Sequence, residues 1–157
     1  MAIAFIGLGS NLGDRQRNLN TALERLGRLA STKILRSSGW IETAPAGGQA
    51  QGMFLNGVAQ IETQLASQRL LDNLQEIEQA LGRPKIHPPL SPRAIDLDLL
   101  TYDQMILQEP DLILPHPRMQ ERIFVLAPLS EIAPDWTHPV LKKSAAELLE
   151  LLIHANR

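Results

Sequence analysis

The chain has 157 residues, a length typical of one domain, with a formal net charge of −2 and no cysteine. The lack of cysteine excludes thiol nucleophiles, cysteine-bound zinc and iron–sulfur clusters, and the balanced charge argues against nucleic acid as a partner. No apolar run approaches the roughly 18 residues of a membrane span, and the N-terminus lacks the basic residues of a signal peptide. We therefore expect a cytoplasmic protein, folded as a single domain over 1–157, with no membrane partner.

The predicted elements alternate short apolar strands with amphipathic helices. The helices are recognised by leucines at spacings of three and four, and the strands by alternating apolar residues. In chain order we expect strands over 2–8, 32–43, 54–65 and 94–102, a short strand over 105–107, and helices over 19–29, 68–81, 118–132 and 144–152. Asp14 or Asn11 is a candidate N-cap for the first helix, and Gly82 is expected to end the second.

This order, β-α-β-β-α-β followed by a C-terminal helical extension, is the pattern of the ferredoxin-like α+β fold. The helices between the strands would cover one face of a mostly antiparallel sheet. We expect loops to roof the opposite face, and a ligand to bind there.

A glycine cluster follows the first strand but matches neither common nucleotide-binding motif. Gly7 and Gly9 fit two glycines of a dinucleotide fingerprint, whereas Leu12 occupies the place of the third. The chain has no Gly-Lys-Ser/Thr sequence, which excludes a Walker A loop. The cluster is therefore interpreted as a tight turn between strand and helix.

Asp96 and Asp98 are the most informative local feature. On a strand, residues i and i+2 share a face and lie roughly 6.6 Å apart, from two rises of ~3.3 Å. Leu97 and Leu99 would occupy the opposite, apolar face. Magnesium is commonly bound by one or two carboxylates together with substrate phosphates. The pair therefore predicts a magnesium site, the alternative being a solvated strand face.

A basic segment leads into this strand, with Arg83, Lys85, His87 and Arg93 interrupted by four prolines. Proline restricts the backbone, and the planar guanidinium of arginine donates two hydrogen bonds to phosphate oxygens. A cationic loop beside a metal-binding strand suits a polyphosphate better than a plain solvated surface.

Two further groups suggest ligand contacts. Proline on both sides holds His116 in an extended backbone, either within a site or in a chain reversal at the surface. Phe54 and Asn56 share one strand face, either as an aromatic platform beside an amide or as core residues. His138 and His154 have no partners at metal-ligand spacing and are expected at the surface.

Several short blocks occur in a fixed order along nearly the whole chain. They are Ile6-Gly-Leu-Gly-Ser-Asn-Leu12, Thr43-Ala-Pro45, Phe54-Leu-Asn56, Glu78 with Gly82-Arg83, Pro92-Arg-Ala-Ile-Asp-Leu-Asp-Leu-Leu100 and Leu114-Pro-His-Pro117. The Pro-Arg-x-x-Asp-x-Asp block, in order with the others, is far more specific than any block alone. In this combination the chain resembles the 6-hydroxymethyl-7,8-dihydropterin pyrophosphokinase family of folate biosynthesis.

The resemblance implies a ferredoxin-like fold with the active site in a groove over the sheet. It also implies transfer of pyrophosphate, the β and γ groups of ATP, to a pterin hydroxymethyl group, with release of AMP. Two Mg²⁺ ions would be held by Asp96 and Asp98. Both substrates would be small molecules, and the protein would act as a monomer.

The same resemblance assigns residues to each substrate. Those on the ATP side are Gln75, Glu78, Arg83, Lys85, Arg93, His116 and Arg122, and the catalytic set is Arg83, Arg93, Asp96 and Asp98. Those on the pterin side are Thr43, Pro45, Phe54, Asn56 and Phe124. Asn56 would read the edge of a pterin ring stacked between Phe54 and Phe124. Apart from the resemblance, the length and proline content of the segment 83–91 predict a lid that closes over ATP.

Some positions differ from the family pattern. Leu90-Ser91 replaces a frequent Trp-Gly pair, and Phe54 replaces a frequent tyrosine. Lys85 stands where arginine is common, Ile113 where a hydroxyl residue is common, and Asp111 where a basic residue can occur. Most of these differences concern the ATP side, and none affects the aspartate pair.

Two alternatives remain at this point. A nucleotidyltransferase of the polymerase-β type also uses Gly-Ser and an Asp-x-Asp strand, but there the two lie roughly ten residues apart, whereas Ser10 and Asp96 are separated by most of the domain. That enzyme would release pyrophosphate rather than AMP. A non-catalytic ferredoxin-like ligand-binding module would explain the fold but not the aspartates, arginines and His116 together.

Overall fold

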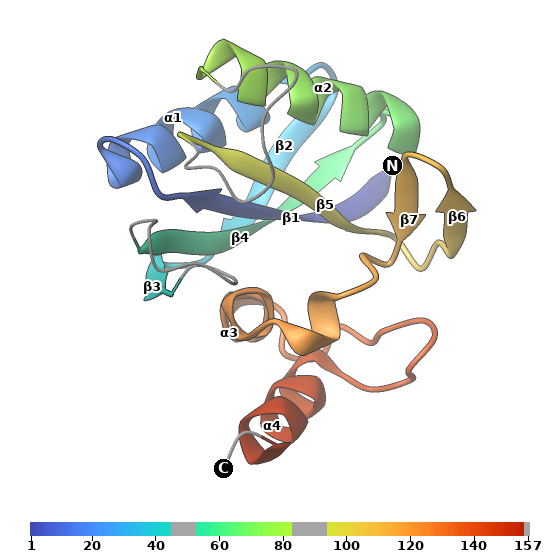
Figure 1. Cartoon of the computed structure of the whole chain (residues 1–157). Coiled ribbons are helices and arrows are strands. Elements are labelled where there is room, and N and C mark those ends of the chain that lie inside the picture. The colour runs from blue at the N-terminus through green and yellow to red at the C-terminus, as the bar shows by residue number, and fades with distance from the viewer. Residues whose placement is uncertain (45–52, 83–93, 156–157) are drawn as a thin grey trace.

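An antiparallel sheet forms the centre of the computed structural model, which describes residues 1–44, 53–82 and 94–155. Its strands are β1 (Ala2–Ser10), β2 (Thr32–Ser37), β3 (Ile41–Thr43), β4 (Phe54–Thr63) and β5 (Asp96–Tyr102). They lie in the order β2-β4-β1-β5, and β3 pairs with the start of β4 (Figure 1). Every pairing is antiparallel. The predicted ferredoxin-like α+β fold is confirmed.

Helices lie on both faces of this sheet (Figure 1). As predicted, α1 (Arg15–Gly27) and α2 (Ser67–Ala80) pack on one face. On the other face α3 (Ile123–Ile132) packs against β4, and α4 (Ala145–Ala155) packs on α3. The C-terminal extension therefore adds a helix to a face that we expected loops to roof. Among the described residues, no helix is long and apolar enough to cross a membrane.

The helix ends follow the local signals in the sequence. Asp14 is the N-cap of α1, and its side chain accepts a hydrogen bond from the backbone N–H of Arg17. Gly82 follows α2 with φ +108°, a conformation that glycine adopts without steric cost. Of the two N-cap candidates, Asp14 is confirmed, so α1 begins four residues before the expected stretch 19–29. The end of the second helix before Gly82 is confirmed as well.

Alternate residues of the strands build the main core beneath α1 and α2. These residues are at most 5% exposed, and they are Ala4, Ile6 and Leu8 of β1, Ala59 and Ile61 of β4, and Leu97 and Leu99 of β5. They pack against the apolar faces of the two helices, including Leu19, Leu26, Leu70 and Leu74. The period-two alternation of each strand thus places one complete set of side chains in the core.

A second apolar cluster joins the opposite face to α3. Phe5 of β1 is 2% exposed and packs edge-on against Trp136. His138 contacts the same tryptophan and is only 5% exposed, so the prediction of a surface histidine was wrong. Its Nδ1 accepts hydrogen bonds from the backbone N–H groups of Val140 and Leu141, both at 3.1 Å. These two N–H groups satisfy the buried ring nitrogen, so His138 has backbone partners rather than the metal for which the sequence spacing was considered.

The strand expected over 32–43 is divided into β2 and β3 by residues 38–40. The Ser38 hydroxyl accepts a hydrogen bond from the backbone of Val58, and the ring of Trp40 lies over Gly57. A Cβ at Gly57 would lie 2.4 Å from that ring. Close packing of Trp40 on glycine, rather than strand propensity, sets this break.

Two further elements differ from expectation. The short strand expected over 105–107 is instead β6 (Leu107–Glu109), which forms a hairpin with β7 (Leu112–Leu114). The helix expected over 118–132 is a short 3₁₀ turn, η1 (Met119–Glu121), followed by α3. Backbone hydrogen bonds back to Arg118 and Met119 close this turn before α3 begins at Ile123.

Candidate active site

Two cavities meet at the start of β5. The first, of about 560 Å³, lies between the sheet and α3, and the second, of about 360 Å³, lies between α2, β5 and the β6–β7 hairpin. Both volumes suit small-molecule ligands. Asp96, Asp98 and His116 line both cavities. These three side chains therefore stand where ligands in the two cavities would approach each other.

Asp96 and Asp98 face the cavities because Leu97 and Leu99, which alternate with them along β5, face the core. Leu97 and Leu99 are 5% and 4% exposed beneath the helices. The backbone N–H of Leu97 donates to the Glu78 carboxylate of α2 at 2.8 Å, and Glu78 is itself only 8% exposed. β5 is an edge strand, so its outward N–H groups need acceptors from outside the sheet. The Glu78 carboxylate provides one, in the place of a carbonyl of a further strand. Glu78 thereby links α2 to the strand that carries both aspartates.

Strand register creates the space around the aspartates. In one row across the sheet Asn56 pairs with Gly9, and Gly9 pairs with Asp96. In the next row Gly7 lies opposite Asp98. Gly9 thus lies between Asn56 and Asp96, and Gly7 between Val58 and Asp98. The absent side chains of the two glycines form part of the floor of the first cavity.

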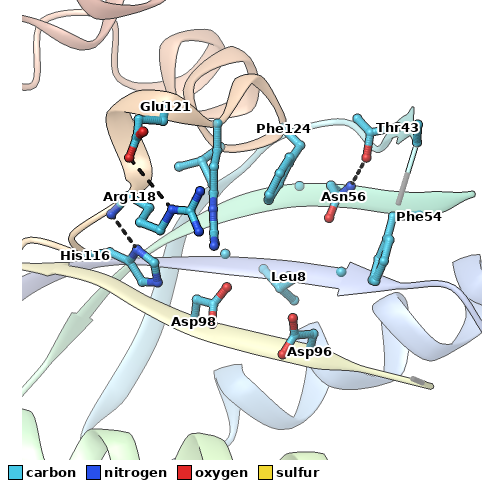
Figure 2. A pocket seen from close by; sticks show the side chains of 16 residues that line it. Leu8, Thr43, Phe54, Asn56, Asp96, Asp98, His116, Arg118, Glu121 and Phe124 are labelled. Carbon is cyan, nitrogen blue, oxygen red and sulfur yellow. Dashed lines mark hydrogen bonds and ion pairs between the residues drawn. The ribbon is translucent and has the colours of Figure 1, made fainter. Parts of the chain in front are cut away.

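Asn56 is held in one orientation in this cavity. Its Nδ2 donates to the Thr43 hydroxyl at 2.7 Å, and the residue is 6% exposed. A Cβ at Gly9 would lie 2.7 Å from the Asn56 Oδ1, closer than side-chain atoms can pack. Figure 2 shows Phe54 from β4 and Phe124 from α3 reaching into the same cavity. The four residues expected at the pterin side and described here are therefore brought together.

His116 is a neutral imidazole at the junction of the cavities. Its backbone N–H donates to Leu100, and its Nδ1 accepts from the backbone N–H of Arg118 at 3.3 Å. The accepting Nδ1 assigns the ring proton to Nε2. Burial lowers the pKa of His116 to about 4, and the nearby cations of Arg122 and Arg118 act in the same direction. The negative charge of Asp96 opposes this shift only in part. The ring therefore offers an N–H donor at neutral pH.

The arginines beside His116 belong to the first cavity. Arg122 was expected on the ATP side, but it lines the cavity that holds Phe54 and Asn56, with its Cζ 5.5 Å from the centre of the Phe124 ring. Arg118 and Glu121 line this cavity as well and form an ion pair at 3.8 Å. The sequence reasoning missed both residues, although Arg118 directly follows the Pro-His-Pro block.

The second cavity collects the remaining described residues of the expected ATP side. Gln75 and Glu78 line it from α2. Asp111 and Ile113, two positions that differ from the family pattern, line it from the hairpin. Gln68 donates to the Asp111 carboxylate at 3.2 Å. At the hairpin edge of this cavity, an acidic residue therefore stands where the family pattern can have a basic one, and an apolar residue stands where a hydroxyl residue is common.

Several expected site residues lie outside the described residues. These are Pro45, Arg83, Lys85, Leu90, Ser91 and Arg93, together with the expected lid over 83–91. Among the residues that are described, no group of three or more histidine, aspartate or glutamate side chains is arranged to hold a metal ion. A cation at Asp96 and Asp98 would accordingly need further oxygen ligands from substrate or water.

Comparisons with known proteins agree on one family. The family model of 7,8-dihydro-6-hydroxymethylpterin-pyrophosphokinase (HPPK) matches residues 5–134. A Bacillus subtilis protein named 2-amino-4-hydroxy-6-hydroxymethyldihydropteridine pyrophosphokinase is 44% identical over 83% of this chain and 77% of its own length. The protein of the same name from Synechocystis is 40% identical over 94% of this chain and 74% of its own length.

Longer proteins contain the same unit. The folic acid synthesis protein fol1 of Pneumocystis carinii is 40% identical over 95% of this chain, which spans 20% of the fol1 length. A crystal structure of HPPK-DHPS in complex with substrates has a TM-score of 0.77 at 14% identity, over 99% of this chain and 44% of that one. This likeness supports the fold, and the sequence matches extend over the cavities described above. The chain belongs to the 7,8-dihydro-6-hydroxymethylpterin-pyrophosphokinase family.

Proposed function

We propose that this chain transfers the β and γ phosphates of ATP, as one pyrophosphoryl group, to the hydroxymethyl oxygen of 6-hydroxymethyl-7,8-dihydropterin. The observation that carries the proposal is the meeting of two cavities at Asp96, Asp98 and His116. One cavity is lined by aromatic rings and an oriented amide, and the other lies beside α2. Two different substrates bound in them would meet at the carboxylate pair.

The first cavity suits the pterin. A pterin ring is flat and has hydrogen-bonding groups along its edge, so stacking supplies affinity and the edge supplies specificity. Phe54 and Phe124 provide the aromatic surfaces, and Asn56, held by Thr43, provides an amide for the edge. Arg122, packed on Phe124, places a cation beside the ring. We propose that the ring binds between the two phenylalanines.

The second cavity suits the nucleotide, with Gln75 and Glu78 on its α2 side. The Nε2–H of neutral His116 is available to donate to a phosphate oxygen at the junction. Since Glu78 accepts from the backbone of β5, its main contribution is to hold the aspartates in place. The ATP chain would then run toward Asp96 and Asp98.

The aspartates fit a magnesium site that is completed by substrate. They lie on one strand face, half-buried, with two carboxylates and no third protein carboxylate or imidazole arranged as a ligand among the described residues. Magnesium prefers this combination of one or two carboxylates with phosphate oxygens and water. We propose that Asp96 and Asp98 hold two Mg²⁺ ions, which would neutralise phosphate charge as the pyrophosphoryl group is transferred.

The reaction needs positioning more than covalent help from the protein. A bond forms between the pterin hydroxymethyl oxygen and the β-phosphorus of ATP, and the bond from that phosphorus to the α–β bridging oxygen breaks. AMP leaves with that oxygen, and the hydroxyl proton is released. The two cavities would align the hydroxyl with the phosphorus.

Product analysis tests this proposal. The protein is incubated with ATP, Mg²⁺ and 6-hydroxymethyl-7,8-dihydropterin, and nucleotides are separated while the pterin product is followed by ³¹P NMR. We expect one AMP per pterin diphosphate, with two coupled phosphorus signals. Release of pyrophosphate would favour the nucleotidyltransferase alternative, and release of ADP a simple kinase. No nucleotide turnover with saturable pterin binding would identify a non-catalytic binding module.

We also propose that the protein acts as a cytoplasmic monomer on small molecules alone. The net charge of −2 gives no basic field for nucleic acid. Sedimentation at working concentration tests the monomer. A dimer whose dissociation abolishes turnover would contradict it.

A further inference from the structure

Arg15 connects the N-terminus of α1 to two strands at once. Its Nη1 donates to the backbone carbonyl of Met53 at 2.9 Å, and its Nη2 lies 2.9 Å from the Glu42 carboxylate. Glu42 belongs to β3, and Met53 directly precedes β4. The planar guanidinium of arginine can donate in two directions from one position, which a lysine ammonium on a flexible stem does less well.

Both partners of Arg15 are chain neighbours of residues in the first cavity. Glu42 precedes Thr43, and Met53 precedes Phe54, and Thr43 is paired with Phe54 in the sheet. Arg15 and Glu42 line a surface depression together with Leu55, whereas Thr43 and Phe54 line the first cavity. Because successive strand residues face opposite sides, Arg15 acts from the other side of the same strand pair.

The strand pair that Arg15 bridges is short. β3 has three residues, and its register with β4 consists of three residue pairs. The Thr43 hydroxyl must stay in place to accept from Asn56. So few ladder hydrogen bonds leave the relative position of Thr43 and Phe54 sensitive to any additional contact.

We propose that Arg15 is a positioning residue for the pterin cavity, an inference that rests on the proposed function. By holding Glu42 and the Met53 carbonyl, it sets the spacing of Thr43 and Phe54 and, through Thr43, the orientation of Asn56. It lines neither of the two cavities that meet at the aspartates. Its effect should therefore reach pterin binding through other residues and leave ATP binding unchanged.

A matched pair of α1 variants tests this role. Arg15→Met removes the guanidinium, and Arg17→Met removes the same charge from an exposed side chain two residues later on the same helix. Pterin binding is measured by calorimetry with a non-hydrolysable ATP analogue and Mg²⁺, and KM is measured for each substrate. For Arg15→Met we expect pterin binding to weaken about three- to tenfold, the size of one ordinary net hydrogen bond, because Arg15 acts on the cavity only through its neighbours. KM for ATP should stay unchanged, and Arg17→Met should match the wild type.

Two further variants separate positioning from general stability. Arg15→Lys should give an intermediate pterin affinity, because it keeps the charge but loses the forked geometry. Glu42→Gln should weaken pterin binding less than Arg15→Met, and the double variant should be less than additive since the two residues share one interaction. Thermal midpoints measured in parallel show whether each variant is folded.

Equal weakening of both substrates by Arg15→Met, or an effect no larger than that of Arg17→Met, would overturn the inference. Recovery of pterin affinity on lowering the temperature, in step with the folded fraction, would also overturn it. Failure of the proposed function has a different signature, since the wild type itself would then produce no AMP. Pterin calorimetry is independent of turnover, so it tests Arg15 in either case.

Discussion

Between Ser10 and Thr63 at its two ends, the central part of the sheet face beneath α1 and α2 is apolar. The face toward α3 instead changes halfway along the same strands. On the first face, Ala4, Ile6 and Leu8 are all at most 2% exposed. On the second, Phe5 is buried against Trp136, but Gly7 and Gly9 follow it in the floor of a cavity.

The neighbouring strands repeat this change. Val58 and Leu100 are buried near α3, while Asn56 and Asp98 line the cavity at the other end of the same face. The comparison shows that the site occupies only the half of one face from which core side chains are missing. The apolar half anchors α3, the helix that carries Phe124 over the cavity. Substitutions on the two faces should therefore separate stability from activity.

Removing the carboxylates should have the largest effect. We expect Asp96→Asn and Asp98→Asn each to lower turnover by about 10³-fold or more, since each removes a metal ligand at the reacting phosphates. The thermal midpoint should stay within a few degrees of the wild type, because the core face of β5 is untouched. Turnover near the wild-type rate in saturating Mg²⁺ would show that the pair holds no essential metal.

Truncating the residue between them should do the opposite. Leu97 is 5% exposed in the main core, so Leu97→Ala should reduce the free energy of unfolding by about 2–5 kcal/mol. Urea unfolding measures this loss. At a temperature where the variant is folded, KM for the pterin should change less than twofold, because Leu97 lines only the second cavity. A selective loss of turnover without a loss of stability would break the division between the faces.

Adding one methyl group to the floor should weaken pterin binding about tenfold or more. A Cβ at Gly9 would lie 2.7 Å from Asn56 Oδ1, so Gly9→Ala must displace the amide. Gly7→Ala adds a methyl group to the same floor, 3.6 Å from Leu100, and so measures the loss of cavity space without displacing Asn56. Calorimetry with the pterin compares the two. Equal affinities would mean that the orientation of Asn56 does not matter.

The two aromatic rings and the amide should contribute next. Phe124→Ala should weaken pterin binding about tenfold, through lost stacking and lost apolar contact, with ATP binding nearly unchanged. Asn56→Ala should reduce discrimination between the pterin and a stacked analogue that lacks the edge donors. Separate titrations of each ligand check both results. If Phe124→Ala lowers the melting temperature and weakens both ligands alike, the ring is a core residue instead.

The smallest expected effect is a pH dependence in the apolar half of the face. Burial lowers the pKa of His138 below its ordinary value, so the unfolded chain binds this proton more readily than the native state. His138 therefore leaves stability unchanged above about pH 6.5 and reduces it as the pH falls below, by at most about 1.4 kcal/mol per pH unit.

His138→Asn, which keeps an acceptor for the Val140 and Leu141 amides, should reduce the loss of stability between pH 7.5 and 5.5. Urea unfolding at the two pH values measures it. If the variant and the wild type lose the same free energy of unfolding between pH 7.5 and 5.5, the pH dependence belongs to other groups. One of them is His116, whose pKa is lowered to about 4.

Most of the fold could be predicted because its signals are local. Alternating residues in 94–102 predicted which side chains of β5 face the core, and leucine spacing predicted α1 and α2. The misses involve contacts between distant residues. Trp40 interrupts a predicted strand by packing on Gly57, and His138 is buried beside Trp136, which itself packs on Phe5 of β1.

By itself, the sequence determined the family, the β-α-β-β-α-β order of the main elements, and the placement of Asp96 and Asp98 opposite two core leucines. Periodicity within one strand is enough for these, because neighbouring side chains must point to opposite faces. Only the tertiary structure decided that Asn56, Gly9 and Asp96 form one row, that Arg122 lies over Phe124, and that Arg15 reaches two strands. Register and side-chain direction depend on how separate elements pack, and no single segment carries that information.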